Sequence, residues 1–82
     1  MQEKLIALSS DFHSRNSLAL SRSAHAIKSM SANIGAEKVR VISAQIEASG
    51  KSGKLDDTED KLVALSAAYN EFVREFRSTF IT

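Results

Sequence analysis

One histidine and the lysine three residues after it are the residues of this chain best suited to chemistry. His25 and Lys28 lie in a stretch without glycine or proline that we expect to be helical, and residues three apart are neighbours on a helix surface. A neutral imidazole keeps a lone pair on one ring nitrogen, so it can accept a phosphoryl group. The ammonium group of Lys28 can offset the added negative charge. The pair suits a transient phosphohistidine, although two ordinary surface residues are the simpler explanation of the spacing alone.

The helix that carries His25 is predicted to turn it toward solvent. At about 100° per residue, the apolar residues Leu20, Ile27, Met30 and Ile34 lie on the side opposite the imidazole. The residues on the imidazole side are mostly small, which leaves the ring unshielded and favours the docking of a partner. We expect the docking contacts to be Leu18, Ser21, Arg22, Ser29 and Ala32.

Four helical segments are expected, over residues 2–14, 17–33, 36–49 and 56–80, because apolar residues recur in each at steps of three and four. Asn16 or Ser17 can cap the second segment, and Gly35 can end it. Residues 50–54 are predicted to be a flexible connection. The fourth segment has the longest stripe, formed by Leu62, Leu65, Tyr69, Phe72, Phe76 and Phe80. The pattern predicts an all-α fold, an antiparallel up-down four-helix bundle that forms one domain over residues 1–82.

Composition narrows the possible functions. A chain of 82 residues has room for one core but not for an enclosed active-site cavity, and a net charge of +1 disfavours binding of nucleic acid. There is no cysteine, no apolar run long enough to span a membrane and no signal-peptide pattern, so we expect a cytoplasmic segment without membrane contact. The spacing of His13 and His25 does not suit a metal site, and Asp56 to Asp60 lacks the pattern of a calcium loop. We therefore expect no metal and no cofactor in this chain.

The residues around His25 carry a family resemblance. Ala24-His25-Ala26-Ile27-Lys28, followed by Ser31-Ala32-Asn33-Ile34-Gly35-Ala36, closely resembles the signature of histidine-containing phosphotransfer (HPt) domains of bacterial phosphorelays. The stretch from Ile46 to Gly53 is similar to the end of that family's next helix and its basic, glycine-bearing turn. The resemblance covers about residues 18–53. It implies that His25 is the phosphorylated histidine, Lys28 the basic residue beside it, and Gly35 the glycine that ends the helix.

One position departs from the family pattern. Ser29 stands where the family usually has a glycine that leaves space for the approaching partner. A serine hydroxyl can hydrogen-bond a phosphoryl group or the backbone one turn back. Ser29 is therefore expected to affect the fit of a docked partner more than the phosphorylation of His25.

The resemblance implies a phosphocarrier of two-component phosphorelays. His25 would accept a phosphoryl group from the aspartate of one response-regulator receiver domain and pass it to another, with Mg²⁺ bound by the receiver. The chain has no nucleotide site, so we expect no ATP-dependent kinase activity of its own. The chain would act as a monomer. It would be either a free-standing protein or the C-terminal module of a hybrid sensor kinase. In the second case it would belong to the cytoplasmic part of a membrane-bound protein. A first helix that is short for the family favours the module.

Two other functions fit the sequence. The first is a non-catalytic helical adaptor that binds receiver or kinase domains through the same face without phosphotransfer. The second is a domain that tethers or dimerises a larger protein through its long, aromatic-rich fourth helix.

Overall fold

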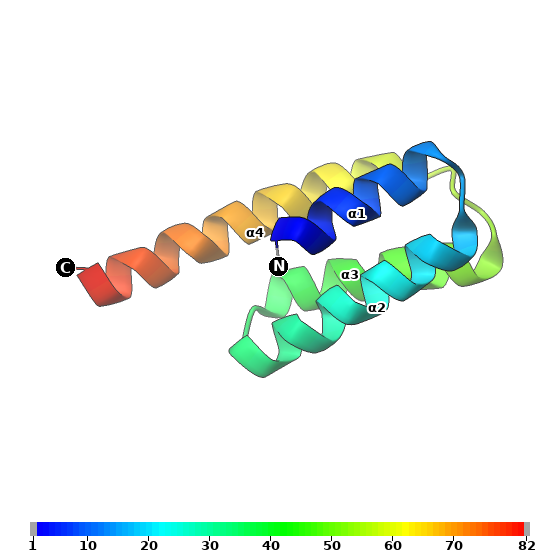
Figure 1. Cartoon of the computed structure of the whole chain (residues 1–82). Coiled ribbons are helices and arrows are strands. Elements are labelled where there is room, and N and C mark those ends of the chain that lie inside the picture. The colour runs from blue at the N-terminus through cyan, green and yellow to red at the C-terminus, as the bar shows by residue number, and fades with distance from the viewer. Residues whose placement is uncertain (1, 82) are drawn as a thin grey trace.

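The computed structural model describes residues 2–81, with side chains from residue 3 to residue 77. Residues 2–81 form four helices, α1 (Gln2–His13), α2 (Ser17–Ile34), α3 (Glu37–Ser52) and α4 (Thr58–Ile81). Each helix runs back along the one before it, and α4 projects well beyond the others (Figure 1). The all-α antiparallel bundle predicted from the sequence is therefore confirmed. No helix within residues 2–81 combines the length and the apolarity that crossing a membrane requires.

The ends of α2 follow from two residues that the sequence singles out. The side chain of Asn16 accepts a hydrogen bond from the backbone N–H of Ala19 at 3.1 Å, so Asn16 is the N-cap. Gly35 adopts the left-handed conformation with φ of 76°, and its N–H donates to the carbonyl oxygen of Ser31. The predicted segment 17–33 is correct to within one residue, and the register of His25 within it is fixed at both ends.

The predicted end of the third helix is wrong. Helix α3 does not stop at residue 49 but continues through Gly50 and Lys51 to Ser52, and Gly53, with φ of 76°, ends it. Three of the five residues expected to form a flexible connection are therefore helical. Because of this extension, Lys51 lies one helical turn after Glu47.

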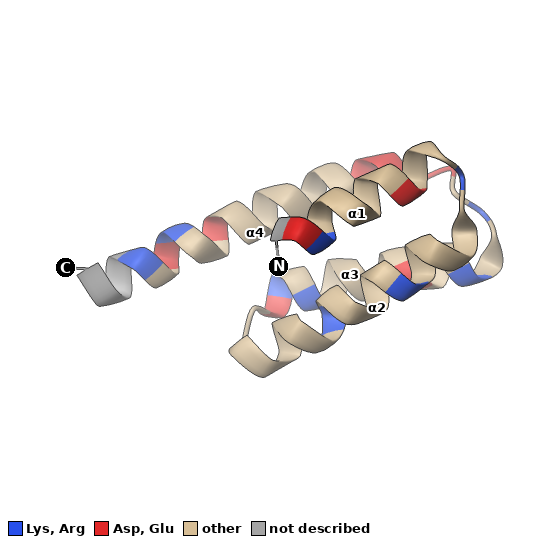
Figure 2. Ribbon diagram, in the orientation of Figure 1, with Lys and Arg blue, Asp and Glu red and all other residues tan. Residues whose placement is uncertain are grey.

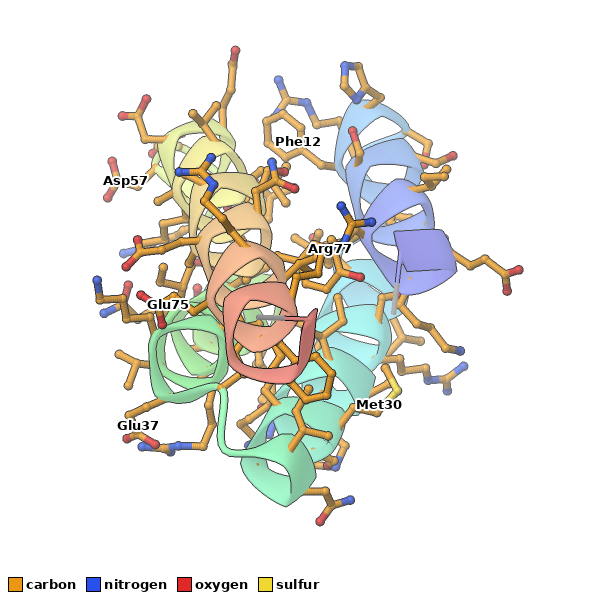
Figure 3. All side chains as sticks on the ribbon, turned by 90° about the vertical axis from the view of Figure 1, so that its left-hand side faces the viewer. Phe12, Met30, Glu37, Asp57, Glu75 and Arg77 are labelled. Carbon is orange, nitrogen blue, oxygen red and sulfur yellow. The ribbon has the colours of Figure 1, made fainter. Side chains whose placement is uncertain are left out.

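The core draws on all four helices. Its buried apolar residues are Leu8, Phe12, Leu20, Ala24, Ile27, Ala36, Val39, Ile46, Leu65 and Ala68. Figure 3 shows the ring of Phe12 between α1 and α4. Three predicted apolar positions depart from this picture. Met30 is only half-buried and points to the outer side of α2, while Ile34 and Phe76 lie more than half exposed toward the end where α4 projects. Phe80 lies outside the residues whose side chains are described.

Charge is distributed unevenly over the helices. Arg22 and Lys28 are the two charged residues in the sequence of α2, whereas α4 carries acidic and basic residues in its first turn and again from residue 71 to residue 77, with an uncharged stretch between them (Figure 2). Both charged residues of α2 are basic, so this helix adds positive charge on either side of His25 along the chain.

Candidate functional site

His25 lies near the middle of α2 with its ring toward solvent. Ala24 and Ile27 lie in the core and anchor this part of the helix, while 60% of the His25 side chain is exposed. The prediction that the imidazole faces solvent is thus confirmed, although one edge of the ring contacts a neighbouring helix. An exposed ring on a helix anchored in the core is accessible to a second macromolecule.

A buried glutamate from the neighbouring helix holds one edge of this ring. Oε2 of Glu47, on α3, lies 3.0 Å from Nδ1 of His25. The other oxygen, Oε1, accepts from Nζ of Lys28 at 2.7 Å, and Nζ of Lys51 lies 3.3 Å from Oε2. Only 8% of the Glu47 side chain is exposed. One carboxylate therefore joins the histidine to two lysines, and we call His25, Lys28, Glu47 and Lys51 the His25 cluster.

The electrostatics of the cluster decide the state of Glu47. The hydrogen bond from Lys28 lowers the pKa of Glu47 most, burial opposes this effect, and the hydrogen bonds from Lys51 and His25 lower the pKa further, to about 2. Glu47 is therefore a carboxylate at neutral pH and can only accept hydrogen bonds.

This state assigns the tautomer of the neutral imidazole. Since the carboxylate oxygen cannot donate, Nδ1 must carry the proton that bridges His25 and Glu47. Nε2, on the other edge of the ring, then keeps its lone pair. The cluster fixes the orientation of the ring and leaves one nitrogen free to act as a nucleophile.

The predicted docking residues separate into two groups. Leu18, Arg22, Ser29 and Ala32 are exposed, as expected, with Leu18 at 62%. Ser21 is the exception, because only 7% of it is exposed. The expectation that Ser21 is open to a partner is wrong. The helix places Ser21 about 40° from His25 on the same side as Lys28. Gly50 and Glu47 of α3 cover that side, because Gly50 lies against the backbone of Ser21 and Glu47 contacts Lys28.

The structure adds Glu47 and Lys51 to the functional candidates named from the sequence. A signal for Glu47 exists in the sequence, since it continues a stripe of α3 formed by Val39, Ser43, Ile46 and Gly50, all buried. A carboxylate on a buried stripe must be paired to be stable there, so its position predicts a cationic partner. The sequence pattern predicts Lys51 in a flexible connection, whereas the longer α3 places it in the helix beside Glu47.

The second histidine, His13, makes its contacts within α1 and not with the His25 cluster. Nδ1 of His13 lies 2.8 Å from the carbonyl oxygen of Ser9, one turn earlier in α1, and its ring forms a T-shaped pair with the ring of Phe12. These contacts are local to α1. The acidic run from Asp56 to Asp60 straddles the start of α4, with Glu59 and Asp60 in the first turn, where negative charge stabilises a helix.

Comparison with known proteins agrees with this geometry. The model of the Hpt domain family matches residues 1–75, which is most of the chain. No curated protein and no solved structure matches. Hpt domains carry out histidine phosphotransfer in phosphorelays and interact with receiver domains. With a family match over residues 1–75, this chain belongs to the Hpt domain family.

Proposed function

We propose that this chain is a phosphocarrier in which Nε2 of His25 accepts a phosphoryl group from a receiver-domain aspartate and passes it to another receiver domain. The observation that carries the proposal is the contact between Glu47 and Nδ1 of an otherwise exposed His25. This contact supports Nε2 as the nucleophile because it occupies the other ring nitrogen with a proton.

The transfer step needs little from this chain beyond an oriented lone pair. The lone pair of Nε2 attacks phosphorus as the bond from phosphorus to the aspartyl oxygen breaks, and the aspartate leaves as a carboxylate. No proton has to be removed from the ring. The phosphorylated imidazole keeps its proton on Nδ1 and carries a positive charge, which the carboxylate of Glu47 stabilises through the same hydrogen bond. The reverse sequence returns the group to a second aspartate.

Two ammonium groups can respond to the charge of the phosphoryl group. Lys28 is about one-third exposed and Lys51 is largely exposed, and both are held within 3.3 Å of Glu47. Each keeps hydrogen-bonding capacity beyond its contact with that carboxylate, since an ammonium group has three donors. We infer that Lys28 is the closer partner of the phosphoryl group, because it shares a helix face with His25.

The surface around His25 fits a receiver domain as the partner. Leu18 supplies an exposed apolar contact, Arg22 a positive charge, and Ser29 and Ala32 leave the ring accessible. The receiver would bring the Mg²⁺ that the reaction uses, and this chain would need no cofactor. We place the exchange in the cytoplasm and expect the chain to act as a monomer.

Phosphoryl transfer to matched histidine variants tests the proposal. Phosphorylated receiver domains are mixed with the wild-type chain, with His25→Gln and with His13→Gln, which removes the other exposed histidine. We expect an acid-labile, base-stable label on the wild type and on His13→Gln, and none on His25→Gln, with unchanged helicity in all three. Label retained by His25→Gln would overturn the assignment.

A further inference from the structure

Gly50 brings the backbone of α3 against the backbone of α2. The residue is buried within α3, and a Cβ built on it would lie 2.9 Å from the carbonyl oxygen of Ser17 and 2.9 Å from the amide nitrogen of Ser21. It would also lie 3.0 Å from Cα of Ser21. These are main-chain atoms of a helix and cannot rotate out of the way. Any side chain at residue 50 must therefore push the two helices apart.

Backbone conformation does not explain the glycine. Gly35 and Gly53 have φ of 76° and open space around them, so they serve as helix ends. Gly50 instead lies inside a helix, with no positive φ, where glycine costs about 1 kcal/mol relative to alanine. Space between the helices is the property that only glycine supplies at this position.

The close approach lies one turn from the His25 cluster. Glu47 precedes Gly50 by three residues, and Ser21 precedes His25 by four, so the two pairs face each other across the same interface. We propose that Gly50 is a positioning residue that sets the spacing at which Glu47 reaches both His25 and Lys28; this inference rests on the proposed function of His25.

The distances show how little separation the cluster tolerates. Ordinary van der Waals contact begins at about 3.4 Å, so a Cβ at residue 50 requires a shift of about 0.5 Å. The same shift would lengthen the contact of Glu47 with His25 from 3.0 Å to the limit of hydrogen bonding. A ring without its carboxylate partner is free to adopt the other tautomer, with the proton on Nε2. Such a ring presents no lone pair at the proposed nucleophile.

The variant Gly50→Ala tests this inference through the nitrogen chemical shifts of His25, which report the tautomer of the ring without any phosphorylation. We expect the protein to remain helical while the ring population moves from the Nδ1–H toward the Nε2–H tautomer. Phosphoryl transfer should slow about tenfold, since sub-ångström misplacement of a reacting group has effects of this order. Gln45→Ala, which places alanine on the exposed side of the same helix, should leave both properties unchanged.

A second variant tests the distance between the carboxylate and His25 without changing the packing of α3 on α2. Glu47→Asp withdraws the carboxylate by one methylene on an unaltered backbone and should shift the tautomer in the same direction. A helical Gly50→Ala protein with the wild-type tautomer would overturn the inference. Loss of the helical signal in Gly50→Ala would also overturn it, because the glycine would then serve folding alone. If no receiver phosphorylates the wild-type chain, the proposed function fails, while the tautomer measurement still decides the role of Gly50.

Discussion

The burial of Glu47 among cations makes a quantitative prediction about stability and pH. Folding lowers the pKa of this carboxyl group from its ordinary value of 4.5 to about 2. A change of that size stabilises the folded protein by at most about 3 kcal/mol at neutral pH. His25 and Lys51 are largely exposed, so water and salt screen part of the interaction. We therefore expect ionised Glu47 to stabilise the folded protein by about 1 to 2 kcal/mol.

The sign of the pH effect follows from the lowered pKa. The stabilisation is complete above pH 4.5, declines as the pH falls and is lost near pH 2, where Glu47 becomes protonated in the folded protein too. Urea unfolding of the wild type and of Glu47→Gln, followed by circular dichroism across this range, measures the effect. The free energy of unfolding should fall with acid by about 1 to 2 kcal/mol more in the wild type than in the variant.

A surface glutamate gives the matched control. Glu71 is half-exposed and pairs with Lys38, so Glu71→Gln removes the same chemical group without touching the His25 cluster. Its unfolding free energy should follow the wild-type pH dependence. Equal acid sensitivity in Glu47→Gln and the wild type would contradict this prediction, since the carboxylate would then have the same proton affinity in the folded and unfolded chains.

Three further variants test the helix that carries the site. Lys28→Ala should slow phosphoryl transfer or shorten the lifetime of the phosphohistidine by about tenfold, measured by loss of label, whereas Lys38→Ala on the surface of α3 should not; equal kinetics in both would remove Lys28 from the mechanism. Asn16→Ala should lower the free energy of unfolding in urea by about 1 kcal/mol through loss of the N-cap, and an unchanged value would show that the cap is not stabilising. Ser29→Gly should speed transfer from a receiver domain by opening space beside His25, while costing about 0.5 kcal/mol in urea unfolding; slower transfer would indicate that the hydroxyl group assists the reaction.

Local signals in the sequence were enough to predict much of the fold. The cap at Asn16 and the left-handed Gly35 are short-range features, so the bounds of α2 followed directly from them. The exposure of His25 followed from the apolar residues on the opposite side of the helix. The core positions Leu20, Ile27 and Leu65 followed from apolar spacing. Gly50 misled the prediction because glycine commonly ends helices, and only the contact with another helix explains why it lies inside one.

The arrangement around His25 was only half predictable for a related reason. Helical periodicity gives the angle of a side chain about its own axis, but not the arc that neighbouring helices cover. Ser21 and Ser29 lie about 40° to either side of His25 around the helix axis. Helix α3 buries Ser21 and leaves Ser29 exposed. Glu47 is separated from His25 by 22 positions, so only the packing of α3 on α2 reveals their contact.

The ring nitrogen that bears phosphorus decides whether Nε2 of His25 is the nucleophile. The wild-type chain, labelled with ¹⁵N in its histidines, is phosphorylated by a receiver domain and studied by phosphorus–nitrogen correlation in NMR. We expect coupling of phosphorus to Nε2 of His25, with the proton retained on Nδ1 beside Glu47. Coupling to Nδ1 of His25, or to either nitrogen of His13, would contradict it.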